Sequence, residues 1–266
     1  MNKAIKAGLL LICALVLMGC LETVTLVHVG KDGSGTIEQS VIISNSFKEL
    51  MLGFGSSEED FELLDQEELE AKAASFGPGV RFVSAEALET ESGAGYKAVY
   101  AFDDITTIRV NQNPGENLPS PDSGQPAEEE PEGEFLSFTF QPGSTARLTI
   151  RRPELEMEED TSDQAEAGEV EGGEEMMDML KNLYRDMRIE IALDVEGDIV
   201  ETNATYAEGN KITYLALDFG KLLENEETFT VLMESNPNSL EELKELIRDY
   251  PGIQMELQEE VKIAFR

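Results

Sequence analysis

The 266-residue sequence contains no tryptophan, one histidine and two cysteines. Cys13 and Cys20 both lie near the N-terminus, and the histidine is His28. A lone imidazole without further thiols cannot form a Cys/His zinc site. After Cys20 the chain has no thiol left for a disulfide, a nucleophile or a thiolate metal site. We therefore expect no bound metal and no cofactor.

Basic residues are also scarce. The chain has 20 Lys and Arg against 55 Asp and Glu, a formal net charge of −35. Such a surface repels nucleic acids and other polyanions, so the composition argues against a nucleic-acid partner.

The N-terminus has the three parts of an export signal. Lys3 and Lys6 are followed by an uncharged apolar stretch from Ala7 to Leu17, too short for the ~20 residues of a membrane span. Leu17-Met18-Gly19-Cys20 then resembles the bacterial lipobox, which places signal cleavage between Gly19 and Cys20 and the lipid on the Cys20 thiol. We expect residues 1–19 to be a signal peptide and Cys20 to carry acyl chains such as palmitate.

This address predicts a location in the cell envelope, outside the cytoplasm. Leu21, next to the lipidated residue, is not the Asp that often retains such proteins on an inner membrane. In a cell with two membranes the sequence therefore favours the outer one.

Two internal segments are acidic and lack aromatic residues. Residues 111–134 hold five of the ten prolines, seven acids and no base, and residues 154–175 hold eleven acids and no base. Such segments bury too little apolar surface to offset the entropy of ordering. We predict that both are disordered loops.

The remaining sequence alternates between strand and helix patterns. Strands are expected at 22–29, 36–44, 80–88, 96–102, 187–193, 200–206, 211–219 and 253–265, with a hairpin at 135–152. Helices are expected from Ser46, at 58–76, at 176–184 and from Ser239 to Tyr250. Tight turns between the strands predict an α+β fold with a mostly antiparallel sheet. Because a lone hairpin is marginal in water, the one at 135–152 must dock on the rest, which predicts a single extracytoplasmic domain over residues 20–266.

The lipobox, the hairpin turn Asp32-Gly33-Ser34-Gly35 and the run from Gly197 to Phe219 resemble the LppM-like envelope lipoproteins. That run contains the Gly-x-Val…Asn…Gly-Asn-x-Val-x-aromatic pattern in the form Gly-Asp-Ile-Val…Asn…Gly-Asn-Lys-Ile-Thr-Tyr. The resemblance covers about a quarter of the chain. It implies an exported α+β domain able to hold a lipid headgroup. Many members end in a membrane helix, whereas this sequence runs to Phe265-Arg266 without one.

No motif predicts catalysis. His28 shares a strand face with Val24 and Leu26, so we interpret it as structural, and no Gly-x-Ser-x-Gly elbow accompanies it. The Asp32–Gly35 segment departs from both EF-hand and phosphate-loop spacing and is interpreted as a turn.

The predicted function is a non-enzymatic, membrane-anchored binding or interaction module for a lipid, another apolar ligand or an envelope protein. Its groove would lie between sheet and helices near Leu69–Phe76 and Leu240–Tyr250, although these residues are also typical of plain core. Two alternatives stay open: a carboxylate-dependent extracytoplasmic hydrolase, and a calcium-responsive surface protein acting through its acidic loops.

Overall fold

The computed structural model describes residues 21–53, 64–112, 135–153, 185–225, 240–248 and 250–266. These residues form two sheets and a few short helices, which confirms the α+β class in its coarse form. The first acidic segment lies outside the described residues from 113 onward and the second lies outside entirely, as does the helix expected at 176–184.

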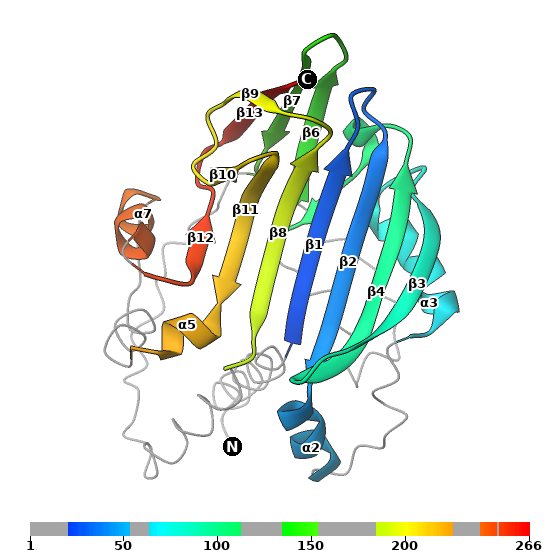
Figure 1. The fold of residues 1–266 in the computed structure, drawn as a ribbon, viewed down its shortest axis with the longest axis vertical. Coiled ribbons are helices and arrows are strands. Elements are labelled where there is room, and N and C mark those ends of the chain that lie inside the picture. Colours follow the sequence, from blue (N-terminus) through cyan, green and yellow to red (C-terminus); the bar gives the residue numbers. More distant parts are fainter. Residues whose placement is uncertain (1–20, 54–63, 113–134, 154–184, 226–239, 249) are drawn as a thin grey trace, which may run out of the picture.

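The larger sheet forms the front layer in Figure 1. Its strands are β1 (Leu21–Val29), β2 (Gly35–Ser44), β3 (Arg81–Glu89), β4 (Gly93–Phe102), β8 (Arg188–Val195), β10 (Ala207–Glu208), β11 (Lys211–Asp218) and β12 (Ile253–Met255). They are ordered β10-β11-β8-β1-β2-β4-β3, with β12 paired to β11. Every pair is antiparallel except β1 and β8, which run parallel at the centre. The sheet is therefore mixed, because the chain between β4 and β8 passes through the second sheet and re-enters beside β1.

The smaller sheet lies behind the upper end of the larger one in Figure 1. Its strands are β5 (Val110–Asn111), β6 (Phe135–Gln141), β7 (Ala146–Arg151), β9 (Ile199–Thr202) and β13 (Glu260–Phe265), in the order β5-β6-β7-β13-β9. Asn111, which the sequence placed in a disordered loop, is paired with Phe135 in this sheet.

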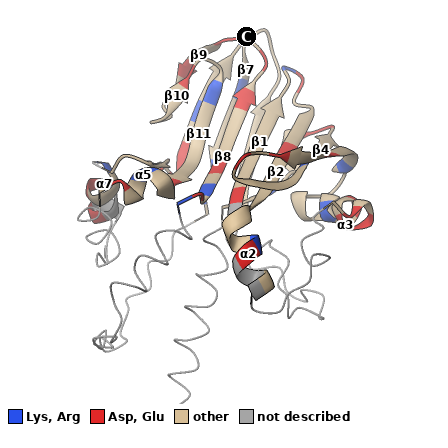
Figure 2. Ribbon diagram, turned by 60° about the horizontal axis from the view of Figure 1, so that its bottom comes forward, with Lys and Arg blue, Asp and Glu red and all other residues tan. Residues whose placement is uncertain are grey.

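The helices cover the flanks and the lower end. They are α2 (Asn45–Gly53), α3 (Gln66–Lys72), α5 (Phe219–Leu223) and α7 (Leu240–Arg248), with 3-10 turns η2 (Ala73–Phe76) and η3 (Ile105–Thr107). In Figure 1, α3 lies on the β3 side and α7 on the β12 side; Figure 2 turns the lower end with α2 toward the viewer.

Two helix starts differ from the sequence prediction. The Ser44 hydroxyl accepts a hydrogen bond from the Phe47 N–H at 3.3 Å, so α2 begins at Asn45 and Ser46 is not its cap. Asp65 accepts from the N–H groups of Glu67 and Glu68 and caps α3, so the described helix starts at Gln66, and residues 58–63 of the helix expected at 58–76 lie outside the described residues.

Two predicted strands are also divided differently. The strand expected at 200–206 ends at Thr202, and it belongs to the small sheet. The single long strand expected at 253–265 is split into β12 and β13, one in each sheet. Glu256 lies between them and is buried, with its carboxylate accepting from the Thr205 N–H at 2.6 Å and the Thr205 hydroxyl at 3.0 Å.

One continuous core joins both sheets. Val27, Ile37 and Phe102 of the large sheet belong to the same buried cluster as Leu148 and Phe265 of the small one. The hairpin of β6 and β7 is thus docked on the larger sheet. A second cluster, formed by Leu222, Ile247 and Ile253, lies under α5 and α7.

Candidate functional site

The lipidation residues Gly19 and Cys20 lie outside the described residues. Leu21, the residue that follows them, is already the first residue of β1 and pairs with Ile43 of β2. The lower end of the large sheet therefore begins directly at the predicted tether. None of the helices in the described ranges has the length and hydropathy needed to cross a bilayer.

His28 lies at the other end of β1, roughly 23 Å from Leu21 at ~3.3 Å per residue. It faces outward with Val24 and Leu26, as the alternation predicted. Its Nδ1 is 3.3 Å from Asp194 Oδ2, and its Nε2 is 3.6 Å from Glu38 Oε1. Glu38 in turn pairs with Lys97 at 2.6 Å. The imidazole thus belongs to a charged row across four strands, which supports a structural role.

The segment around Asp32 is a turn. Asp32 Oδ1 accepts hydrogen bonds from the Ser34 hydroxyl at 2.7 Å and the Ser34 N–H at 3.0 Å, and these bonds lower the pKa of Asp32. Gly33 has φ +87°, a backbone conformation that favours glycine. In the described part of the chain, no group of three or more His, Cys, Asp or Glu side chains is arranged to hold a metal ion.

The two apolar stretches named as groove walls do not meet. Leu69, Ala73 and Phe76 are buried in the core shared by the two sheets, whereas Ile247 belongs to the second cluster. Figure 1 shows α3 and α7 at opposite edges of the large sheet. The interpretation as core is confirmed for Leu69, Ala73, Phe76 and Ile247, and the two described stretches form no groove between them.

Along the strands of the large sheet, the side chains on its inner face change from apolar to partly polar. On β1 the inward side chains are Val29 and Val27 near the hairpin, then Thr25 and Thr23 toward the lower end. On β2 Ile37 is followed on the same face by Gln39, which pairs with Thr25 on one side and Ala98 on the other. The interior is thus apolar at the upper end, where the small sheet packs, whereas below it buried polar side chains alternate with apolar ones such as Val41 and Ile191.

Three side-chain atoms of this face are buried and have no hydrogen-bond partner among the described residues: Gln39 Oε1, Thr23 Oγ1 and Tyr100 Oη. Gln39 is 4%, Thr23 3% and Tyr100 0% exposed. Burial raises the pKa of Tyr100. An unpaired buried polar group costs roughly 1–3 kcal/mol, so such groups are rare and call for a water or a ligand. We refer to Thr23, Gln39 and Tyr100 as the inner polar patch.

A lysine lies beside this patch. Lys72, the last residue of α3, donates a hydrogen bond to the Tyr96 hydroxyl at 3.4 Å. Burial lowers the pKa of Lys72 to about 8, and burial together with the charge of Glu68 raises that of Tyr96 to about 12. The next turn of the chain packs on the same strand, with Phe76 and Tyr100 rings 4.9 Å apart. Helix α3 therefore brings a cation and an aromatic ring to the inner face.

The inner polar patch was missed from sequence. Thr23, Thr25 and Gln39 are in phase with buried Val and Ile residues, so periodicity assigns them to the core without indicating that their polar atoms lack partners. The signal that was available is the change from Val to Thr along one face of β1.

Comparisons with known proteins add a weak structural resemblance to these observations. No protein-family model matches the chain, and no curated protein matches it. A matching solved structure is the NMR structure of the folded domain of LppM from Mycobacterium tuberculosis. The two chains are 12% identical over 76% of this chain and 84% of that one, with a TM-score of 0.33. The structural resemblance is weak, and membership of the LppM-like family stays a prediction.

Proposed function

We propose that this chain is a lipid-anchored lipoprotein of the cell envelope that binds an amphiphilic ligand, without catalysis, between the large sheet and α3. The observation that carries the proposal is the inner polar patch, three buried polar atoms without a hydrogen-bond partner among the described residues, on the sheet face where Lys72 and Phe76 contact Tyr96 and Tyr100.

The anchor rests on the lipobox at Leu17–Cys20 and on where the fold begins. With β1 starting at Leu21, no spacer separates the acyl chains from the large sheet, so its lower end would lie at the bilayer surface. Two or three acyl chains, at ~0.8 kcal/mol per buried CH₂, hold a protein on a membrane far more firmly than one. Within the inner polar patch, Thr23 is near that end of the large sheet, whereas Tyr100 pairs with Ile37 farther up.

The ligand class follows from the chemistry of the patch. Gln39 and Tyr100 can accept or donate hydrogen bonds to a hydroxyl, ester or phosphate, and Lys72 adds a positive charge. Phe76, Val41 and Ile43 supply apolar surface on the same side. Polar groups beside apolar side chains suit a molecule with a polar head and a hydrocarbon part, such as a lipid.

The carboxylates of the described core support a structural role instead of a hydrolytic one. Burial raises the pKa of Glu190, but ion pairs with Lys211 and Arg188 outweigh it and keep that pKa below the usual range. Glu256 is held by Thr205. The calcium-responsive alternative depends on acidic segments that lie almost wholly outside the described residues, and it remains a prediction.

Full-length protein purified from membranes in a non-ionic detergent, then analysed by native mass spectrometry, tests the binding proposal. We expect a retained lipid in wild type and its loss in Gln39→Leu, which keeps side-chain size but removes the polar atoms. Ser40→Ala, one residue away on the opposite face of β2, is the matched control and should retain the lipid. Wild type without retained lipid, or equal retention in Gln39→Leu, contradicts the proposal.

Labelling with radioactive palmitate tests the anchor separately. We expect label in wild type and none in Cys20→Ser. Equal labelling of the two proteins would contradict the proposed lipid anchor on Cys20, whatever the ligand experiment shows.

A further inference from the structure

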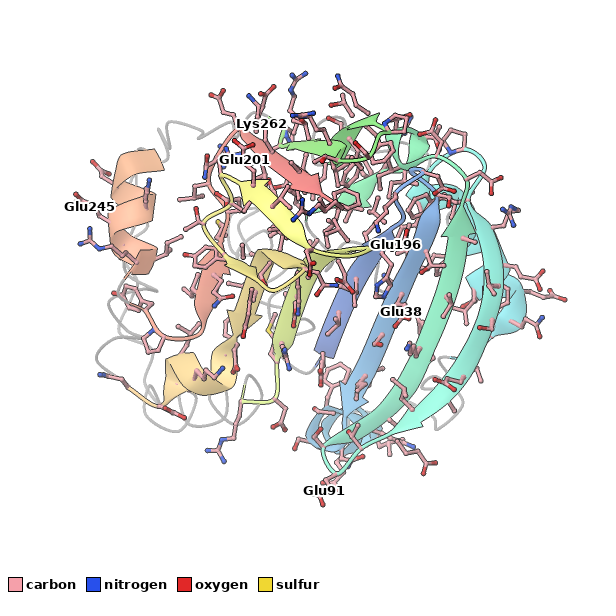
Figure 3. All side chains as sticks on the ribbon, turned by 45° about the horizontal axis from the view of Figure 1, so that its top comes forward. Glu38, Glu91, Glu196, Glu201, Glu245 and Lys262 are labelled. Atoms are coloured by element: carbon pink, nitrogen blue, oxygen red, sulfur yellow. The ribbon has the colours of Figure 1, made fainter. Side chains whose placement is uncertain are left out.

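The outer face of the small sheet, turned away from the core, carries a cleft of about 300 Å³. Six of its lining residues have side chains on this outer face: Arg147 and Thr149 on β7, Lys262 and Ala264 on β13, and Glu201 and Asn203 on and after β9. Figure 3 shows Lys262 and Glu201 near each other at this end of the molecule. The inner polar patch is not part of this site.

A small residue in the middle strand creates the cleft. Ala264 pairs with Arg147 on one side and with Glu201 on the other, so a methyl group separates a guanidinium from a carboxylate. Ala264 is 7% exposed although it is on the outer face, because the longer side chains of neighbouring residues surround it. It is the floor of the cleft.

The wall next to Lys262 is held rigidly. Asn203 Oδ1 accepts from the Lys262 N–H at 2.6 Å, and its Nδ2 donates to the Glu260 carbonyl at 2.9 Å and to Gln258 Oε1 at 2.8 Å. The Gln258 amide donates back to the Asn203 carbonyl. A site whose backbone is fixed in this way loses little conformational freedom when it binds.

The charge of this face is unlike that of the whole chain. Among the outward side chains of β7 and β13, Arg147, Arg151 and Lys262 are basic and Glu260 is acidic, whereas the chain as a whole has 20 bases and 55 acids. Glu260 pairs with Arg151 at 2.5 Å and with Lys262 at 3.3 Å, and both interactions lower its pKa. Arg147 has no ion pair with any residue of the described ranges. Within the part of the chain that the structure describes, its guanidinium therefore borders the cleft without a salt-bridge partner.

We propose that this cleft binds an anionic group, a phosphate or a carboxylate, on a molecule in the aqueous space of the envelope. Arg147 supplies a planar, bidentate donor, the type of group that suits such oxyanions. Lys262 adds charge from the neighbouring strand, and the Thr149 hydroxyl can donate a further bond. Glu201, across Ala264, accepts from a hydroxyl or ammonium next to the anion and so selects its orientation.

The position of the cleft identifies the source of the anion. β1 starts at the lower end of the molecule in Figure 1, and the small sheet lies at the upper end. A chain tethered before Leu21 therefore presents this cleft away from its own membrane, toward soluble or polymer-borne anions and not toward the headgroups beside the anchor.

Calorimetric titration of the full-length protein in non-ionic detergent, with glycerol 3-phosphate and with glycolate as probes at constant ionic strength, tests the inference. We expect saturable binding of at least one probe in wild type. Arg147→Gln should weaken it at least tenfold, and Ala264→Leu should abolish it by filling the cleft without changing any charge.

Two control variants show whether a loss of binding is specific to this cleft. Arg81→Gln removes an exposed arginine of β3 that pairs with Asp103 at 2.6 Å, and it should leave the affinity unchanged. Gln39→Leu should also leave it unchanged, because the inner polar patch is a different site. The melting temperature of each variant reports whether it is folded, and Lys262→Gln offers a milder change in the same cleft.

Absence of saturable binding by both probes, or wild-type affinity in Ala264→Leu, would overturn the inference. A further arm uses vesicles containing phosphatidylglycerol with the Cys20→Ser chain, for which we expect no Arg147-dependent pelleting. Pelleting that Arg147→Gln removes would overturn the assignment to the aqueous space and identify the membrane as the source of the anion.

Discussion

The upper and lower halves of the large sheet's inner face differ in the contacts that their buried side chains make. At the upper end Val27, Ile37 and Phe102 pack against the small sheet, and the contact is apolar. At the lower end Thr23 and Gln39 occupy equivalent positions on the same strands, and their buried oxygens have no hydrogen-bond partner in the described ranges. The inner face of the large sheet thus combines a region whose apolar contacts stabilise the fold with a region whose buried polar atoms lower its stability.

This difference indicates a division of roles. Apolar burial contributes roughly 25 cal/mol per Å², so the upper half holds the two sheets together. The lower half gives up part of that stability, which is expected where polar atoms are kept available for a ligand. Substitutions in the two halves should therefore change stability in opposite directions.

The largest effect is expected at the junction of the sheets. Phe265 is 0% exposed, and its ring lies 6.4 Å from that of Phe140. Phe265→Ala should reduce the free energy of unfolding by about 3–5 kcal/mol, because it removes buried area and leaves a cavity. Urea denaturation measures the change, with exposed Val83→Ala as the control. A loss below about 1 kcal/mol would mean that the small sheet contributes little to the fold.

The next largest effect on stability is expected at Glu190, a buried carboxylate with two ion-pair partners. Glu190 is paired with Lys211 and Arg188, so its carboxylate is stabilised in the folded state and its pKa is lowered. Glu190→Gln should cost about 2 kcal/mol at pH 7. The wild-type advantage is fully present above the unfolded pKa near 4.5 and is lost as the pH falls through the lower folded value. Denaturation curves between pH 3 and 7 for both proteins test this; a difference that does not vary with pH would contradict it.

A half-buried lysine without an ion pair in the described part of the chain should behave in the opposite way. The folded pKa of Lys72 is about 8, against 10.5 as the ordinary value. Between these two pH values the unfolded chain binds more protons, so stability should rise with pH. Lys72→Met should raise the free energy of unfolding by about 1–2 kcal/mol at pH 7 and flatten that rise. Comparing the two proteins from pH 7 to 10.5 cancels other titrating groups, and a destabilised Lys72→Met protein would refute the desolvated lysine.

The smallest effect is expected at the unpartnered hydroxyl. Tyr100→Phe removes a buried oxygen that makes no hydrogen bond to any residue the structure describes, so the delipidated protein should keep its stability or gain up to about 1 kcal/mol. The same variant should retain less lipid than wild type. Thermal melting after delipidation measures the first effect, and a loss above about 1 kcal/mol would show that the hydroxyl has a partner.

Local patterns predicted most of the strands. Alternation of side chains located β1, β2 and β4 to within a few residues and both strands of the β6–β7 hairpin, because each pairs with a neighbour close in sequence. A similar alternation from Ile253 to Phe265, interrupted only at Glu259, was interpreted as one strand and could not show that the chain changes sheets at Glu256. That break depends on Thr205, which is distant in sequence.

The candidate sites were less accessible to sequence reasoning. Cys20 was predicted because a lipobox is a contiguous motif, whereas the cleft at Arg147, Ala264 and Glu201 joins three strands that are far apart in the chain. An alanine between an arginine and a glutamate is visible only once the register of those strands is known.

The sequence alone determined the acidic composition, the strand-rich class and which side of most strands is apolar, and it predicts the export signal that ends at Cys20. These properties depend on residue type and on short-range periodicity, which do not require a folded chain. The tertiary structure decided that β1 and β8 run parallel, that residues 253–265 divide between two sheets, and which buried oxygens are left without partners. Each of these depends on contacts between residues many positions apart, whose pairing is set by the packing of the whole core.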